Sequence, residues 1–158
     1  MILSNSKQLE SLLYSILCIL CSIVVSVYTQ FVTFTIQVSS EWMYYLLRTL
    51  VYPGIIEEVS WRLWAQPSPL EDMHITHRVL WCSLAVLGFI LYHPMIAYVT
   101  KKYTCFYNPA FLSLALILGI TCTVLYQSTG SILPSILLHW LMVAVWLSFL
   151  GGDKVLFE

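Results

Sequence analysis

Long apolar runs constrain this chain more than any other feature of its sequence. Residues 12–38, 79–100, 109–126 and 132–150 are each apolar over about the ~20 residues that an α-helix needs to cross a bilayer. Hydrophobic residues make up 59% of the 158 positions and charged residues only 9%, which excludes an ordinary soluble domain. The sequence therefore predicts an all-α, multi-pass transmembrane helical bundle in a membrane, which we expect to be the cell membrane.

A charged stretch interrupts the apolar sequence at Glu57, Glu58 and Arg62. An ionised side chain at the centre of a bilayer costs roughly 2.5–3.5 kcal/mol, so these groups must neutralise one another, line a wet cavity or take part in chemistry. In a helix Glu58 and Arg62 are four positions apart, with the acid on the N-terminal side, which favours an ion pair. Glu57 points ~100° away and is free to act as a general base. The alternative is a pair that only lets a helix end reach the membrane interface.

The charged stretch lies in a further predicted helix, residues 41–66, which brings the expected number of spans to about five. Pro53-Gly54 predicts a kink or break just before Glu57. A discontinuous helix at membrane depth is tolerated only against protein or a water-filled cavity, which favours a functional site. We expect an accessory membrane helix in residues 1–40, a four-helix core of the catalytic type in 41–150 and a short tail in 151–158. The first run is too long for a signal peptide and is interpreted as a retained anchor.

The remaining ionisable groups are less informative. His93 and His139 lie within apolar runs, where an ionisable residue is a functional hypothesis by default, although a buried histidine with a hydrogen-bond partner is common. His74 and His77 form a His-x-x-His pair in a polar connection and are interpreted as solvated. The five cysteines are odd in number and mostly lie within apolar runs, so disulfide or metal frameworks are not expected. The net charge of −1 gives no sign of nucleic-acid binding.

Taken together, the charged residues and histidines form three ordered motifs on separate predicted helices. These are Glu57-Glu58-x-x-x-Arg62, Phe89-x-x-x-His93, and His139 in the last helix. In order and spacing they resemble the CAAX protease and bacteriocin-processing family of intramembrane proteases, which includes the type II CAAX prenyl endopeptidases. That family's motifs are E-E-x-x-x-R, F-x-x-x-H and H-x-x-x-N or -D, and the resemblance covers about residues 48–150.

The resemblance implies a glutamate-dependent endopeptidase with no metal or other cofactor. By position, Glu57 would activate the attacking water and His93 would help to hold it. Glu58 and Arg62 would brace the site, and His139 would stabilise the oxyanion. The implied substrates are peptides or membrane-anchored proteins, with prenylated proteins among the options, and the lipid bilayer is the other partner.

One position departs from the family pattern, and two other functions also stay open. Val143 stands where the family has Asn or Asp, and valine has no donor for an oxyanion. Losing one such donor costs about 10²–10³-fold in rate. A catalytically silent protein that acts by partner binding, as in bacteriocin self-immunity, is therefore the main alternative. A zinc peptidase with Glu57, His93 and His139 as ligands is the third.

Overall fold

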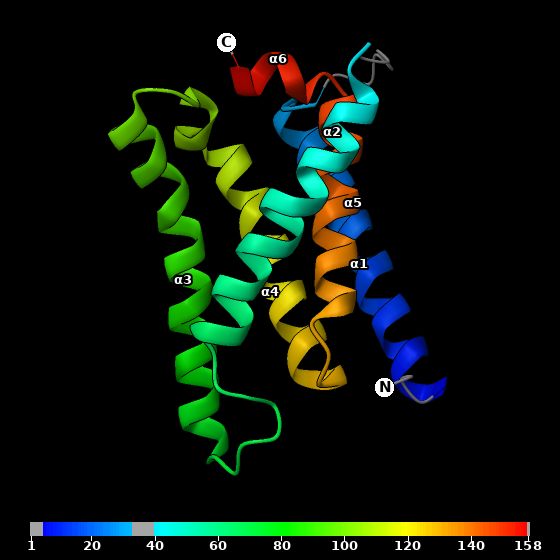
Figure 1. Ribbon diagram of the computed structural model, residues 1–158, viewed down its shortest axis with the longest axis vertical. Coiled ribbons are helices and arrows are strands. Elements are labelled where there is room, and N and C mark those ends of the chain that lie inside the picture. Colours follow the sequence, from blue (N-terminus) through cyan, green and yellow to red (C-terminus); the bar gives the residue numbers. More distant parts are fainter. Residues whose placement is uncertain (1–4, 33–39, 158) are drawn as a thin grey trace.

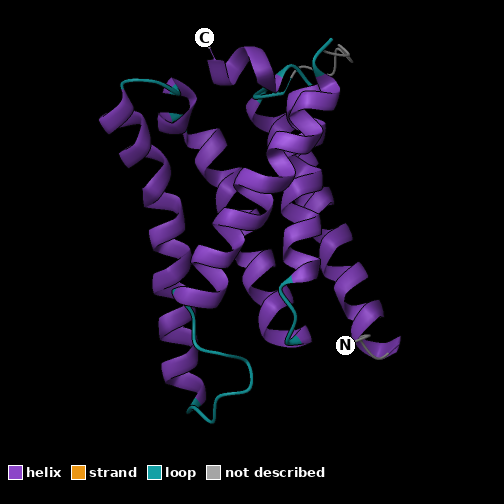
Figure 2. Ribbon diagram, viewed as in Figure 1, coloured by secondary structure: helices purple, strands orange, loops and turns teal. Residues whose placement is uncertain are grey.

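The computed structural model describes residues 5–32 and 40–157, and within these residues all regular structure is helical (Figure 2). The helices are α1 (Asn5–Thr29), α2 (Trp42–Thr49), the π-helical segments η1 (Leu50–Glu57) and η2 (Val59–Trp64), α3 (Ile75–Thr100), the 3₁₀ turn η3 (Thr104–Tyr107), α4 (Pro109–Thr129), α5 (Leu133–Phe149) and α6 (Gly152–Phe157). The all-α bundle expected from the apolar runs is confirmed.

Helix α4 is the centre of the bundle and packs against α1, α3 and α5. The helical stretch from α2 through η2 runs obliquely, contacting α5 through α2 and η1 and contacting α3 through η2 (Figure 1). The two ends of the chain lie at opposite ends of the bundle (Figure 1). This arrangement places η1 and η2, which carry the charged motif, between the helices that carry His93 and His139.

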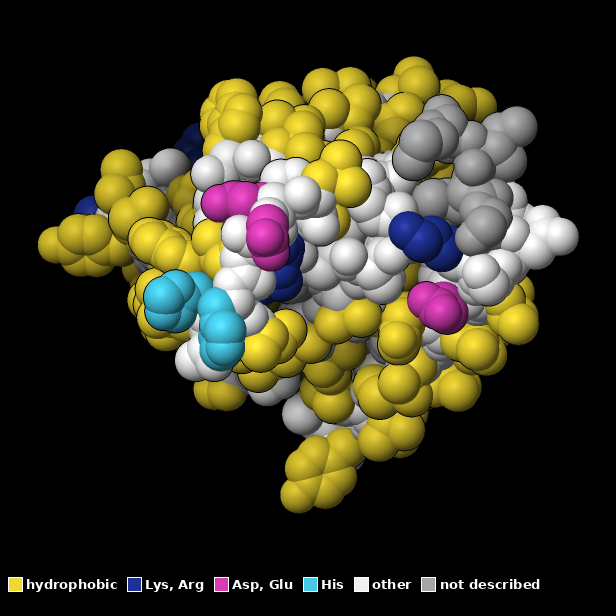
Figure 3. Space-filling view, turned by 90° about the horizontal axis from the view of Figure 1, so that it is seen from below, with side chains coloured by type: hydrophobic (Ala, Val, Ile, Leu, Met, Phe, Trp, Pro, Cys, Tyr) yellow, Lys and Arg dark blue, Asp and Glu magenta, His cyan; other side chains and the backbone are white. Residues whose placement is uncertain are grey.

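The surface of the bundle is that of a membrane protein. Helices α1, α3 and α4 are long and apolar enough to cross a membrane by length and composition, and α5 is a shorter apolar helix. Large hydrophobic side chains are exposed along all of them. Acidic, basic and histidine side chains gather on the lower face of the molecule, inside a rim of hydrophobic side chains (Figure 3). The sides of the bundle are thus suited to lipid and its lower end to water.

The largest differences from the helix boundaries expected from the sequence are in α1 and α3. Helix α1 ends at Thr29, where Gln30 takes a left-handed φ of 54°, instead of continuing through the apolar run; the expected end at Val38 lies outside the described residues. Helix α3 begins at Ile75, one turn earlier than expected, because the His74 side chain accepts a hydrogen bond from the Thr76 amide and caps it. The proposed division into accessory helix, core and tail stays a prediction.

The predicted irregularity at Pro53-Gly54 takes the form of π-helix. Proline has no amide hydrogen and its ring clashes with the carbonyl four residues earlier, so an α-helical turn cannot close over it. The wider i→i+5 turn avoids that clash without breaking the helix. Gly54 in the same segment allows α5 to approach, since a Cβ there would lie 3.2 Å from Trp140 Cβ. This close approach brings His139, one residue before Trp140, against the charged motif.

Candidate active site

Three charged or ionisable side chains from two helices form a fully buried chain of contacts. Arg62 Nε lies 3.1 Å from Glu58 Oε2, the pair predicted from their four-residue spacing. Glu58 Oε1 accepts a hydrogen bond of 2.8 Å from His139 Nδ1, across 81 residues of sequence. Glu58 and Arg62 are 0% exposed and His139 is 3% exposed. Because a carboxylate only accepts, Nδ1 of His139 carries the proton and the ring is fixed in one orientation.

Glu57 faces the other nitrogen of the same histidine. Its Oε2 lies 3.9 Å from His139 Nε2, which is too far for a direct hydrogen bond but close enough for one water molecule to contact both atoms. Glu57 is 8% exposed, whereas Glu58 is not exposed at all. The two adjacent glutamates thus differ in environment: Glu58 is held in an ion pair with Arg62, and Glu57 lies at the edge of the buried group.

His93 approaches from α3 and is held by its own motif. Its Nδ1 donates to the Phe89 carbonyl at 2.9 Å, which leaves Nε2 as the acceptor of the neutral ring. The Phe89 ring meets the His93 ring edge to face at 5.0 Å, as its i,i+4 spacing predicts. Phe106 and Phe111 contact the His93 ring at 5.1 and 5.2 Å. His93 is therefore enclosed by aromatic rings and is only 7% exposed.

Phe89 joins the two histidines into one site. Its ring also meets His139 edge to face at 5.9 Å, and the Arg62 guanidinium lies 5.5 Å from the ring centroid. The ring fits because α4 has Gly119 opposite it, where an added Cβ would lie 2.9 Å from Phe89 Cδ1. We call the group formed by Arg62, His93 and His139 around this ring, together with Glu57 and Glu58 beside His139, the buried cluster.

The structure thus places all five residues singled out from the sequence in one place, but not every feature of the sequence belongs to it. His74, which caps α3, and His77, in the first turn of that helix, are both exposed. Val143 is half-buried on α5, one turn beyond His139. In the described part of the chain, no three His, Cys, Asp or Glu residues are grouped so that they could hold a metal ion.

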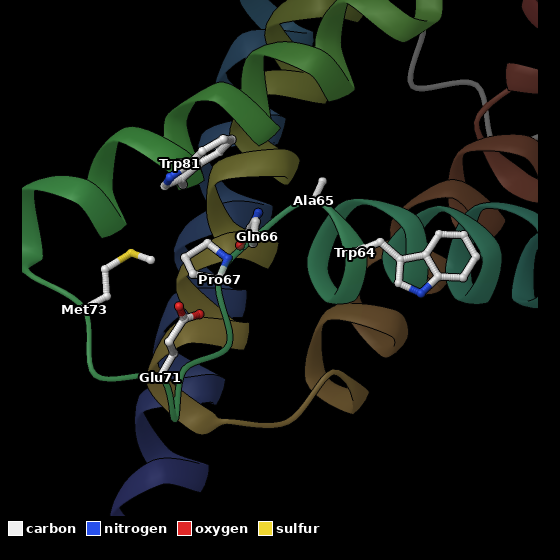
Figure 4. Close-up of a pocket in the computed structure, with 7 residues that line it drawn as sticks. All are labelled: Trp64, Ala65, Gln66, Pro67, Glu71, Met73 and Trp81. Carbon is white, nitrogen blue, oxygen red and sulfur yellow. The ribbon is translucent and has the colours of Figure 1, made fainter.

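A pocket of about 250 Å³ opens at the lower end of the charged helix, away from the cluster. Its lining includes Trp64, Gln66 and Trp81, and none of the five cluster residues (Figure 4). Gln66 donates to Thr123 on α4 at 2.8 Å, so this end of the helix is fixed to the centre of the bundle. The pocket therefore borders the end of the helix that is bonded to α4, and it does not open onto the buried cluster.

Several residues that shape the site were not identified from the sequence. Gly119, Phe106 and Phe111 hold Phe89 and His93 in place, but each lies in an unremarkable apolar segment or turn. The contact between His139 and Glu58 was also missed, because periodicity within one helix carries no information on which distant helix it packs against. No local signal in the sequence could have found these contacts.

Comparison with known proteins places this arrangement in a family. A family model described as type II CAAX prenyl endopeptidase Rce1-like matches residues 38–145, which include the whole buried cluster. No curated protein and no solved structure matches the chain. The match covers more than half of the chain and confirms the resemblance drawn from the three motifs. This protein therefore belongs to the Rce1-like family of type II CAAX prenyl endopeptidases, a family of membrane proteases.

Proposed function

We propose that the protein is a glutamate-dependent intramembrane endopeptidase and that Glu57 is its general base. The observation that carries the proposal is the contrast between the two neighbouring glutamates. Glu58 is bound by Arg62 and His139, whereas the Glu57 carboxylate faces His139 Nε2 across 3.9 Å and retains some exposure. Two adjacent carboxylates with different partners suit different tasks, one for chemistry and one for support.

In this mechanism a water molecule lies between Glu57 and the substrate, with His93 Nε2 as a second acceptor. Glu57 removes a proton from the water, the water oxygen attacks the peptide carbonyl carbon, and the carbonyl oxygen takes the negative charge. Glu57 then gives the proton to the leaving nitrogen as the C–N bond breaks. His139 stabilises the oxyanion through Nε2–H when the ring is protonated, and Glu58, bonded to Nδ1, stabilises that protonated ring.

The substrates proposed are peptides or membrane-anchored proteins, including prenylated ones, because the family's described activity is on prenylated C-termini and the sides of the bundle are lipophilic. The reaction proposed needs no bound metal, since a carboxylate base and histidine donors together supply the chemistry of amide hydrolysis. Full activity in the presence of a strong chelator is expected, and a requirement for added zinc would contradict this part of the proposal.

The test is a cleavage assay in liposomes on a mixed pool of peptides and prenylated peptides, read by mass spectrometry. Glu57→Gln should abolish cleavage without unfolding the protein, because the amide keeps the size of the side chain and removes its basicity. Glu10→Gln, at an exposed glutamate in α1, is the matched control and should cleave like the wild type. Cleavage that survives Glu57→Gln would remove Glu57 from the mechanism.

Val143 favours a second candidate function, partner binding by a catalytically silent protein, as in bacteriocin self-immunity. Under that function the wild type and Glu57→Gln give the same phenotype, and cleavage appears only when Val143→Asn supplies a donor. A phenotype that depends on the Glu57 carboxylate would exclude it.

A further inference from the structure

The buried cluster offers few free hydrogen-bond donors for a reaction that places negative charge on a carbonyl oxygen. His139 uses its Nδ1 hydrogen on Glu58, and His93 uses its own on the Phe89 carbonyl. Arg62 is 0% exposed and paired with Glu58, so burial closes its guanidinium off from a substrate. Val143 has no donor. Only His139 Nε2 is left in these residues to face an oxyanion, whereas such sites are built from several preorganised donors.

A pair of tyrosine hydroxyls lies next to the cluster, and one of the two O–H groups is not used in the hydrogen bond between them. Tyr52 of η1 and Tyr92 of α3 place their hydroxyl oxygens 3.0 Å apart. Each hydroxyl has one hydrogen, so the bond between them uses one and leaves the other free to donate elsewhere. Tyr52 is 46% exposed and Tyr92 is half-buried, which makes Tyr92 the inner member of the pair. If Tyr52 donates to Tyr92, the free hydrogen belongs to the tyrosine nearer the site.

Tyr92 is held beside the reacting groups from two sides. It precedes His93, and their rings meet edge to face at 5.7 Å. Trp61 of η2 meets the Tyr92 ring at 5.9 Å, and Gly88 leaves room for the indole, since a Cβ there would lie 2.8 Å from it.

The π-helical segment brings the second tyrosine to the same side. Tyr52 lies five positions before Glu57, within η1. In an α-helix residues five apart point about 140° away from each other, whereas a π-helical turn, which bonds i to i+5, brings them close to one side. Tyr52, whose hydroxyl reaches Tyr92 of α3, therefore lies on nearly the same side of η1 as Glu57.

We propose that Tyr92 is a further catalytic residue, which supplies the oxyanion donor that Val143 lacks; this rests on the proposed function. As the water oxygen bonds to the carbonyl carbon, the electron pair of the C=O π bond moves to the oxygen, and the Tyr92 O–H donates a hydrogen bond to it without transferring its proton. When the C–N bond breaks, the pair returns to the C=O bond, and the nitrogen takes the proton from Glu57. The Tyr52 hydroxyl donates to Tyr92 and strengthens it as a donor.

The experiment measures kcat and KM for one cleaved peptide with the full-length protein in liposomes. Tyr92→Phe should lower kcat by about 10²–10³-fold with KM nearly unchanged, the usual effect of losing one oxyanion donor. Tyr52→Phe should have a smaller effect, because Tyr92 keeps its hydrogen. Adding Val143→Asn to Tyr92→Phe should recover part of kcat by supplying a donor from α5. Tyr98→Phe, at an exposed tyrosine of the same helix, is the matched control.

The outcomes separate this inference from the proposed function. If the wild type cleaves, Glu57→Gln does not, and Tyr92→Phe cleaves as well as Tyr98→Phe, the inference is wrong and the function stands. If Tyr52→Phe and Tyr92→Phe lower the rate equally, and Val143→Asn does not help, the pair only joins two helices and the inference is again overturned. If neither the wild type nor Val143→Asn cleaves any peptide, both fail together.

Discussion

The buried ion pair makes the sharpest prediction about stability. Arg62→Met removes the guanidinium while keeping most of the side-chain volume. It leaves the Glu58 carboxylate, which is 0% exposed, without its cation. Breaking a buried pair from one side costs about 3–5 kcal/mol. Because Glu58 Oε1 keeps the 2.8 Å bond from His139 Nδ1, we expect a free-energy loss near the lower end, about 3 kcal/mol, or roughly a hundredfold in the unfolding constant.

The double variant Glu58→Gln/Arg62→Met should recover most of this loss. Neither introduced side chain is charged, and the amide oxygen still accepts from His139 Nδ1. Replacing both members of a buried pair is often neutral or stabilising, whereas removing one is not. The free-energy changes of the two single variants should therefore not sum to that of the double variant. The difference between the sum and the double-variant value measures the coupling between the two buried charges.

The assay is reversible unfolding in mixed micelles, followed by tryptophan fluorescence. Arg48→Met is the matched control, because Arg48 is a half-buried arginine on α2 whose guanidinium lies 5.9 Å from the Tyr44 ring. It should cost no more than about 1 kcal/mol. An Arg62→Met loss as small as that of Arg48→Met, or a double variant less stable than either single one, would refute the assignment of a buried and mutually dependent pair.

Two further predictions test other parts of the structure. Gly119→Ala should destabilise the protein by about 1–3 kcal/mol and slow cleavage, because the new Cβ would lie 2.9 Å from Phe89 Cδ1; unchanged unfolding and kinetics would show that the ring is not held there. Burial raises the pKa of the Cys105 thiol to about 11, so only ~0.1% is thiolate at pH 8. Maleimide labelling of Cys105 should therefore be slow at pH 8, and its rate should increase with pH up to about 11. Labelling should become fast after the protein is unfolded in detergent. Fast labelling of the folded protein at pH 8 would contradict this.

The sequence predicted the contacts that lie within one helix. Four-residue spacing was enough to predict the pair of Glu58 with Arg62 and the packing of Phe89 on His93, because helical geometry alone decides them. Pro53 predicted a local irregularity for the same reason, although its form as π-helix depends on how the neighbouring carbonyls and α5 accommodate the ring. The roles of the five cluster residues in catalysis stay predictions.

Contacts between helices could not be predicted in this way. The bond from His139 to Glu58 depends on how closely α5 crosses η1, which is decided by Gly54 and not by either of the two residues. The pairing of Tyr52 with Tyr92 depends in turn on the turn width of η1. Rules for three- and four-residue spacing predict neither the distance between α5 and η1 nor the turn width of η1. The motif resemblance identified the cluster residues without specifying which of them touch.

The Phe89 ring holds both histidines of the site in place before a substrate binds. Its ring contacts both imidazoles and the guanidinium, and it is 1% exposed, so neither histidine can change rotamer without displacing it. The conformational entropy of the two histidines is therefore lost when the protein folds and not when a substrate arrives. Substrate binding energy can then be used to bring the peptide carbonyl to the water, since the groups that receive it are already in place.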